Sequence, residues 1–199
     1  MIHTAEELIR SEISQNGRIP FDEFMDIALY SRRGYYRRLD HIGTEGDYYT
    51  SPRVHPVFGA LVCAQIMQMW ALMEEPHRFT IVEQGAGDSV LAEDILNAAR
   101  QINQRFYQSL DYVLYDIRSV PTTRAKIRTV ESSSVHLRDI TGVVISNELL
   151  DSFPVKLVQI VNGEVMELFV TTDSKGKLIE ELDMKLDKLA KIGLDTTGL

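Results

Sequence analysis

The stretch of sequence that decides the fold is Val82-Glu83-Gln84-Gly85-Ala86-Gly87-Asp88-Ser89. It closes an apolar run that begins at Phe79, and a helical pattern of apolar residues follows over positions 90–99. The expected order is therefore a strand, a glycine-rich turn and a helix, which lets a ligand approach the backbone closely. A Gly-x-Gly pair alone is a weak signal, so a plain strand-to-helix turn remains an alternative.

Glu83 indicates which kind of ligand this turn would bind. Its carboxylate is expected at the carboxyl end of the strand, where it suits a cationic group better than a pyrophosphate. The chain also lacks the third glycine that a dinucleotide-binding motif needs at its spacing after Gly85 and Gly87. Together these features favour the amino group of S-adenosylmethionine.

Two further apolar runs extend the pattern into an α/β fold. Residues 112–116 and 142–147 read as buried strands, a weaker strand is expected near residues 135–137, and a short helix is expected after Pro121. Strands that alternate with helices predict a parallel, Rossmann-like sheet. Asp116 ends the second strand, where its carboxylate could accept hydrogen bonds from both ribose hydroxyls. The alternatives are an exposed acid or an N-cap.

The loop after residues 142–147 carries Asn147, Glu148 and Asp151 at the carboxyl end of the most confident strand. Open α/β sheets place their active sites at this edge. Two carboxylates at this spacing could bind a guanidinium in a forked arrangement and help to deprotonate it. Spacing alone favours the alternative, in which Asp151 or Ser152 caps a short helix and Glu148 is solvated.

The N-terminal region reads as helical. Thr4 and Glu7 form a capping box, Gly17 ends the first helix, and Pro20 is expected to open the second. A long third helix is expected from Ser51 to about Met73, with inward-facing Val54, Val57, Phe58, Leu61 and Trp70.

The C-terminal region reads as a hairpin and a helix. Asn162-Gly163 joins runs 156–161 and 164–170, and Lys175-Gly176 turns the chain again before an expected helix over 181–191. We therefore expect three segments: a helical region over 1–75, a Rossmann-like core over 76–155, and a hairpin with a short helix over 156–199.

Composition narrows the function classes. The chain has 199 residues and a net charge of −8, from 21 Lys and Arg against 29 Asp and Glu. This charge argues against a general nucleic-acid binder. No apolar stretch reaches the ~18 residues of a membrane helix, and the N-terminus is not a signal peptide, so we expect a cytoplasmic protein. A single Cys63 and five scattered histidines predict no metal site.

Four blocks of sequence resemble the MidA (DUF185) family of S-adenosylmethionine-dependent methyltransferases, which includes a mitochondrial complex I assembly factor that methylates protein arginine. The blocks are Phe24–Tyr30 with Gly34-Tyr35-Tyr36; Ile42-Gly43 with Gly46–Pro52 and Phe58-Gly59; Glu83-x-Gly85-x-Gly87; and Asn147-Glu148 with Asp151 and Pro154-Val155. They stand in family order over residues ~20–170. The chain departs from the family at Ser89, where a glycine is usual, and at Asp116, where glutamate is usual.

The resemblance implies a class I methyltransferase core with S-adenosyl-L-methionine as cofactor. Glu83, Gly85 and Gly87 would hold its methionine end, Asp116 its ribose, and Asp47, Thr50 and Ser51 would line the pocket. The residues expected to face the substrate are Asn147, Glu148 and Asp151. The implied partner is a protein with an exposed arginine. Two other hypotheses stay open: a catalytically impaired cofactor-binding or assembly scaffold, and a fragment of a longer enzyme.

Family members also continue well beyond the length of this chain. The strands that flank residues 142–147 on their far side are not all accounted for, and an edge strand exposes unpaired backbone groups. We therefore expect that the Asn162-Gly163 hairpin or a second chain, as in a homodimer, covers this edge.

Overall fold

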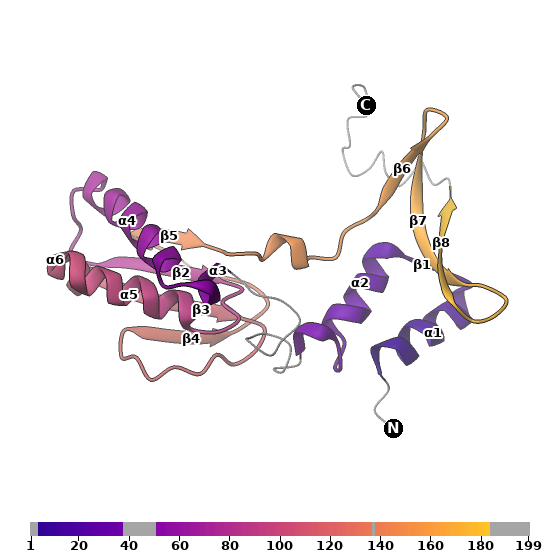
Figure 1. Ribbon diagram of the computed structural model, residues 1–199, viewed down its shortest axis with the longest axis horizontal. Helices are drawn as coiled ribbons and strands as arrows, with labels where there is room; N and C mark the ends of the chain where they lie inside the picture. The colour runs from indigo at the N-terminus through magenta and orange to yellow at the C-terminus, as the bar shows by residue number, and fades with distance from the viewer. Residues whose placement is uncertain (1–3, 38–50, 137, 184–199) are drawn as a thin grey trace. The chain divides into compact units, whose positions relative to one another are not determined.

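The computed structural model describes residues 4–37, 51–136 and 138–183, which divide into two compact units. One unit combines the described residues up to 37 with those from Ser152 onward, and the other lies between them in the chain. Figure 1 shows the elements of both. This division differs from the three segments expected from the sequence, because the helix over Val57–Leu72 packs within the unit of the parallel sheet.

The second unit contains a parallel sheet of the Rossmann-like kind, with strand order β4-β3-β2-β5. The strands are β2 (Phe79–Gln84), β3 (Leu110–Asp116), β4 (Ile127–Glu131) and β5 (Gly142–Ile145). The α/β fold expected from residues 79–147 is therefore confirmed.

The expected strand near residues 135–137 is wrong in position. β4 lies at Ile127–Glu131 instead, and only Ile127 in it is buried. An edge strand of mostly polar residues gives no apolar run to detect. Val135 packs instead against the buried Val82 and Val113.

Alternation along the strands gives the sheet two different faces. Phe79, Ile81, Tyr112 and Leu114 belong to the larger core cluster. This cluster also includes residues of α4 (Val57–Leu72), α5 (Val90–Ile102) and α6 (Gln104–Ser109), the helices that cover this face (Figure 1). Val82, Val113 and Tyr115 point to the opposite face, where the cluster of the described residues is smaller.

The expected long helix over 51–73 is broken. α3 covers Ser51–Val54 and α4 begins at Val57, with Pro56 at its N-cap. Proline disfavours helical backbone in the residue before it, which here is His55. Trp70 is buried as expected, and Phe58 packs against the core. Three side chains expected inside are instead exposed, namely Val54, Val57 and Leu61 at 70%, 53% and 66%.

A second helix prediction in this unit is also wrong. No helix is assigned between Pro121 and β4, a stretch that lies wholly within the described chain. Pro121 is followed by two threonines, which favour extended backbone over helix.

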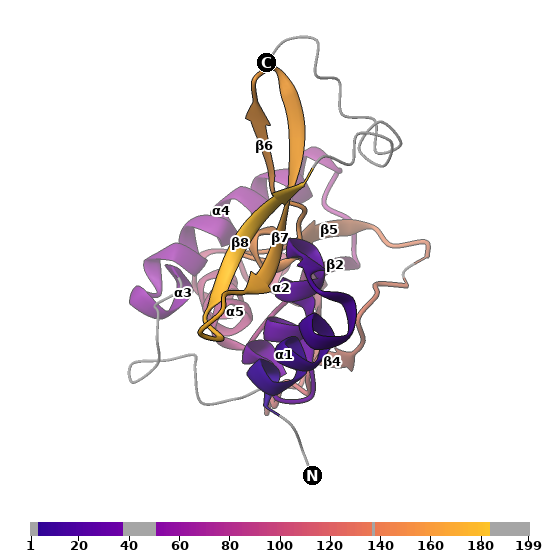
Figure 2. The same ribbon diagram turned by 90° about the vertical axis from the view of Figure 1, so that its right-hand side faces the viewer.

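The first unit packs two helices against an antiparallel sheet (Figure 2). Its elements are α1 (Ala5–Asn16), β1 (Ile19–Pro20), α2 (Phe21–Tyr30), η1 (Tyr35–Arg37), β6 (Val158–Val161), β7 (Glu164–Thr172) and β8 (Leu178–Asp183). The capping box is confirmed, since Thr4 Oγ1 accepts the Glu7 N–H and Glu7 Oε2 accepts the Thr4 N–H. Gly17 ends α1 with a φ of 78°. Pro20 is the N-cap of α2 rather than its first residue.

The Asn162-Gly163 hairpin is confirmed, and both turn residues have positive φ, at 53° and 81°. After the Lys175-Gly176 turn, β8 pairs with β7 in antiparallel fashion. The expected helix over 181–191 is therefore wrong for residues 181–183, because they pair within β8; residues 184–191 lie outside the described residues.

The expectation that this hairpin covers the open edge of the parallel sheet is wrong. β6 and β7 belong to the other sheet, since the Phe169 and Val170 end of β7 pairs with β1. Among the described strands β5 pairs with β2 alone, so β5 is the edge strand. Covering of this edge by a second chain stays a prediction.

We predict that Gly142→Ala destabilises the parallel-sheet unit. A Cβ at Gly142 would lie 1.9 Å from the Thr80 carbonyl oxygen, so the β2–β5 backbones would have to separate. The expected loss is about 1–3 kcal/mol of unfolding free energy, the usual cost of overpacking. Urea unfolding followed by tryptophan fluorescence measures it through Trp70, which is buried in the same unit.

The matched control is Gly176→Ala in the other unit, where a Cβ would meet nothing within 4 Å and the φ of 77° confines the strain to its own turn. It should leave the Trp70 transition unchanged. Equal Trp70 transitions for Gly142→Ala and the unmodified chain would contradict the close backbone approach.

Candidate functional site

The turn between β2 and α5 adopts a backbone conformation that requires its glycines. Gly85 and Gly87 have φ of 69° and 63°, a region that side-chain-bearing residues rarely adopt. The Gly85 N–H donates to the Tyr115 carbonyl oxygen at 2.8 Å. A Cβ at Gly87 would meet no atom within 4 Å, so the described residues leave the space beside Gly87 open.

Asp116 lies at this turn, as the sequence predicts. It is the last residue of β3 and is 7% exposed. Its Oδ2 accepts the Gly87 N–H at 2.8 Å, and its Oδ1 accepts the Arg118 N–H at 3.0 Å. The carboxylate is therefore held in place by backbone donors on two sides, one of them in the turn itself.

Arg118 is a site residue that is not expected from the sequence. Its Nε lies 3.4 Å from Asp116 Oδ1, and its Nη2 donates to the Gly87 carbonyl oxygen at 3.3 Å. The side chain is only 12% exposed. An Asp-x-Arg pair is too common to indicate a site, so no sequence signal separates this arginine from the others.

Glu83 is buried beside the turn, at 3% exposure. The Tyr112 hydroxyl donates to its Oε2 at 2.7 Å. Burial, together with the smaller effect of the negative charges of Asp88 and Asp116, raises the pKa of Glu83 to about 7, although the Tyr112 hydrogen bond lowers it. A buried tyrosine needs a hydrogen-bond partner, and Tyr112 finds it in Glu83.

The loop after β5 reaches the same turn through an apolar contact. A Cβ at Gly85 would lie 2.5 Å from Leu149 Cδ1, so this leucine covers the glycine. Asn147 is half-buried, whereas Glu148 is exposed and has a φ of 52°. Asp151 is exposed within the short helix η2 (Leu150–Ser152), so it is a helical residue rather than its cap. Leu149 is likewise a residue of this region that is not expected from the sequence.

The remaining predicted residues contribute less. Ser51 is the first residue of α3, and Asp47 and Thr50 lie outside the described residues. Ser89, where the related family usually has glycine, has a φ of −94°, which serine adopts readily. Its hydroxyl donates to Glu93 Oε1 at 2.8 Å. This position therefore does not require glycine.

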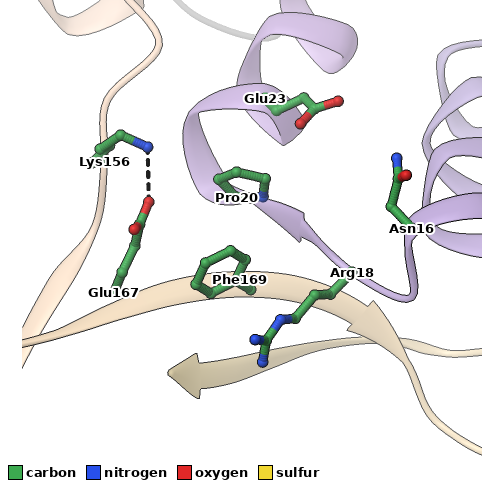
Figure 3. A pocket seen from close by; sticks show the side chains of 7 residues that line it. All are labelled: Asn16, Arg18, Pro20, Glu23, Lys156, Glu167 and Phe169. Atoms are coloured by element: carbon green, nitrogen blue, oxygen red, sulfur yellow. Dashed lines mark hydrogen bonds and ion pairs between the residues drawn. The ribbon is translucent and has the colours of Figure 1, made fainter. Parts of the chain in front are cut away.

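A depression of about 380 Å³ lies in the other unit, lined by Asn16, Arg18, Pro20, Glu23, Lys156, Glu167 and Phe169 (Figure 3). Most charged side chains that line this depression already contact an oppositely charged or aromatic side chain. Lys156 Nζ contacts the buried Glu167 at 2.7 Å and Asp22 at 3.1 Å, and Arg18 lies over the Phe169 ring at 4.6 Å. None of the predicted site residues lines it.

A family of proteins described as "Putative S-adenosyl-L-methionine-dependent methyltransferase" matches residues 61–196, more than half of the chain. This match includes the turn, Asp116 and the loop after β5. Within the described residues, no helix is long and apolar enough to cross a membrane.

Curated relatives carry a more specific name. The chain is 27% identical over 193 residues to "Protein arginine methyltransferase NDUFAF7 homolog, mitochondrial" of Drosophila melanogaster, covering 83% of this chain and 44% of that protein. It is 30% identical over 149 residues to the Bos taurus protein named "Protein arginine methyltransferase NDUFAF7, mitochondrial", covering 68% of this chain and 34% of that one. The chain thus spans less than half the length of these relatives. Its expected cytoplasmic location stays a prediction.

A solved structure has the same fold. A COG1565 superfamily member and likely methyl transferase from Burkholderia thailandensis, bound to S-adenosyl-homocysteine, aligns with a TM-score of 0.77 at 24% identity. The alignment covers 96% of this chain and 54% of that one. A native structure of a COG1565 protein from the same organism aligns with a TM-score of 0.72.

We predict that Glu83→Gln stabilises the protein more at pH 8 than at pH 5. Since the folded-state pKa of about 7 lies above the ordinary glutamate value of 4.5, the contribution of Glu83 is fully present below pH 4.5 and is lost as the pH rises through 7. Glutamine does not ionise, so the variant does not lose this stability at high pH. Urea unfolding at both pH values should show the difference growing by about 2 kcal/mol.

Glu131→Gln is the matched control, because Glu131 is exposed at the end of β4. The additional stabilisation at pH 8 should be confined to Glu83→Gln. Parallel stability profiles for Glu83→Gln and the unmodified chain would contradict a raised pKa at Glu83.

Proposed function

We propose that this chain, which belongs to the family of S-adenosyl-L-methionine-dependent methyltransferases, transfers a methyl group to a protein arginine side chain. The methyl donor is the cofactor S-adenosyl-L-methionine. The observation that carries the proposal is the hydrogen bond between the Gly87 N–H and the Asp116 carboxylate. This hydrogen bond joins the glycine turn, which has open space beside it, to the carboxylate at the end of the neighbouring strand. A nucleoside-binding site needs both a turn that a ligand can approach closely and a carboxylate for the ribose hydroxyls.

The residues present fit the cofactor. Gly87 leaves room for close approach of a ligand to the backbone, and Asp116 would accept hydrogen bonds from the ribose. Glu83 would face the amino group, and a cation nearby would lower the pKa of its carboxyl and favour the ionised form. When bound, S-adenosyl-L-methionine supplies an electrophilic methyl group on a sulfonium.

The loop after β5 would serve the methyl acceptor. Glu148 and Asp151 are both exposed at the carboxyl end of β5, where carboxylates can pair with a guanidinium and take up its proton. Asn147 would help to orient it. Leu149, which covers Gly85, would exclude water between the two sites. The choice of arginine is supported by the names of the curated relatives.

A scaffold that binds the cofactor without transferring its methyl group is the second candidate. The two candidates share the cofactor site and differ only in turnover, so binding and transfer have to be measured separately.

We predict that Asp116→Ala weakens binding of S-adenosyl-homocysteine by about 1–3 kcal/mol, because the ribose hydroxyls lose a charged acceptor. Isothermal titration calorimetry measures the affinity. Asp26→Ala on α2, an exposed aspartate of the other unit, is the matched control and should leave it unchanged. No binding to the unmodified chain would refute the proposed cofactor, and equal affinity for Asp116→Ala would remove Asp116 from the site.

We predict that Glu148→Gln leaves this affinity within about 2-fold and lowers methyl transfer to arginine-containing peptides by about 100-fold, the scale of a lost acid–base group. Radiolabelled methyl incorporation measures the transfer, with Glu131→Gln as control. Glutamine preserves the size of the side chain at this positive-φ position. Loss of both binding and transfer would contradict a substrate-side role. Binding by the unmodified chain without transfer would favour the scaffold.

A further inference from the structure

The side chain of Arg118 spans the two groups that define the nucleoside site. Its Nε faces Asp116 Oδ1 at 3.4 Å, while its Nη2 donates to the Gly87 carbonyl oxygen at 3.3 Å. The guanidinium thus lies across the turn and the end of β3. With 12% of the side chain exposed, it is held in the site and is not a solvated surface arginine.

The acceptor capacity of Asp116 is nearly used in this arrangement. An ionised carboxylate has about four acceptor positions. Three N–H donors already point at Asp116, from Gly87, from the backbone of Arg118 and from Arg118 Nε. The two hydroxyls of a ribose would bring the donors to five, so one donor has to leave when both hydroxyls bind.

The donor that leaves is identified by the geometry. The two backbone N–H groups are fixed by the turn and by the chain after β3, and their distances are 2.8 and 3.0 Å. The Nε contact at 3.4 Å is the longest of the three, and it belongs to a side chain that can rotate. A guanidinium is also readily solvated once it reaches the surface.

We propose that Arg118 is an affinity-determining residue that closes the ribose subsite in the absence of ligand and withdraws from Asp116 when a ribose binds. The proposal rests on the proposed function, because it takes Asp116 as the ribose acceptor. In the closed state Arg118 provides a positive charge beside Asp116, within an acidic group that also includes Glu83 and Asp88. Ligand affinity is then reduced by the cost of separating the guanidinium from the carboxylate.

The first test compares the affinity of S-adenosyl-homocysteine for the unmodified chain, Arg118→Met and Arg128→Met by isothermal titration calorimetry. Methionine keeps a long apolar stem and removes the guanidinium. Arg118→Met should bind about 3- to 10-fold more tightly, the scale of one net hydrogen bond. Arg128→Met removes the same charge from an exposed position of β4 and should bind as the unmodified chain does.

The outcomes separate the two proposals. No binding to the unmodified chain would overturn the proposed function, whatever Arg118 does. Binding to the unmodified chain with equal or weaker binding to a folded Arg118→Met would overturn the role of Arg118 alone. A thermal melt of each variant shows whether it is folded.

A second measurement needs no variant. A crystal structure of the unmodified chain with S-adenosyl-homocysteine should show the ribose hydroxyls on Asp116 and Arg118 Nε beyond hydrogen-bond distance of it. Arg118 Nε still bonded to Asp116 beside a bound ribose would overturn the proposal. The crystal structure therefore tests the role of Arg118 even if the Arg118→Met variant does not fold.

Discussion

The hydrogen bond from the Gly87 N–H to the Asp116 carboxylate is the constraint on which the rest of the site depends. It joins the turn after β2 to the end of β3 at 2.8 Å, and the Gly85 N–H joins the same two segments through the Tyr115 carbonyl oxygen. Parallel pairing of β2 with β3 brings these groups to one edge of the sheet. Because the glycines have positive φ, their N–H groups can point at the neighbouring strand end, which an ordinary strand-to-helix turn would not allow.

Much of the fold could be predicted because its signals are local. The apolar runs of β2 and β3, the capping box at Thr4 and the Asn162-Gly163 turn each depend on residues that are adjacent in sequence. The predictions fail at positions where tertiary packing, and not the local sequence, determines the structure. β4 is a largely polar edge strand whose buried residue is Ile127. α4 is apolar on all sides, so its sequence does not show that Leu61 is exposed while Trp70 is buried.

The same distinction applies to the site. Glu83, Gly85, Gly87 and Asp116 follow strands that could be recognised, so their convergence could be predicted. Tyr112, Arg118 and Leu149 could not, since each acts through a residue on a different segment: Glu83, Gly87 and Gly85 respectively. The burial that raises the pKa of Glu83 is likewise a property of the packed sheet, and the residue itself looks in sequence like any acid at a strand end.

The division of the first unit between two distant stretches of chain has a consequence for the order in which the protein forms during synthesis. Ile19 of β1 pairs with Val170 of β7, 151 positions later, so at about 5–20 residues per second β1 is made about 8–30 s before its partner. The parallel-sheet unit is complete in the nascent chain before β7 is, since it lies between them. Its folding would shorten the effective loop between β1 and β7 and so reduce the entropy lost when they meet. Folding of the parallel-sheet unit therefore makes it easier to form the other unit, whose two stretches of chain precede and follow it in sequence.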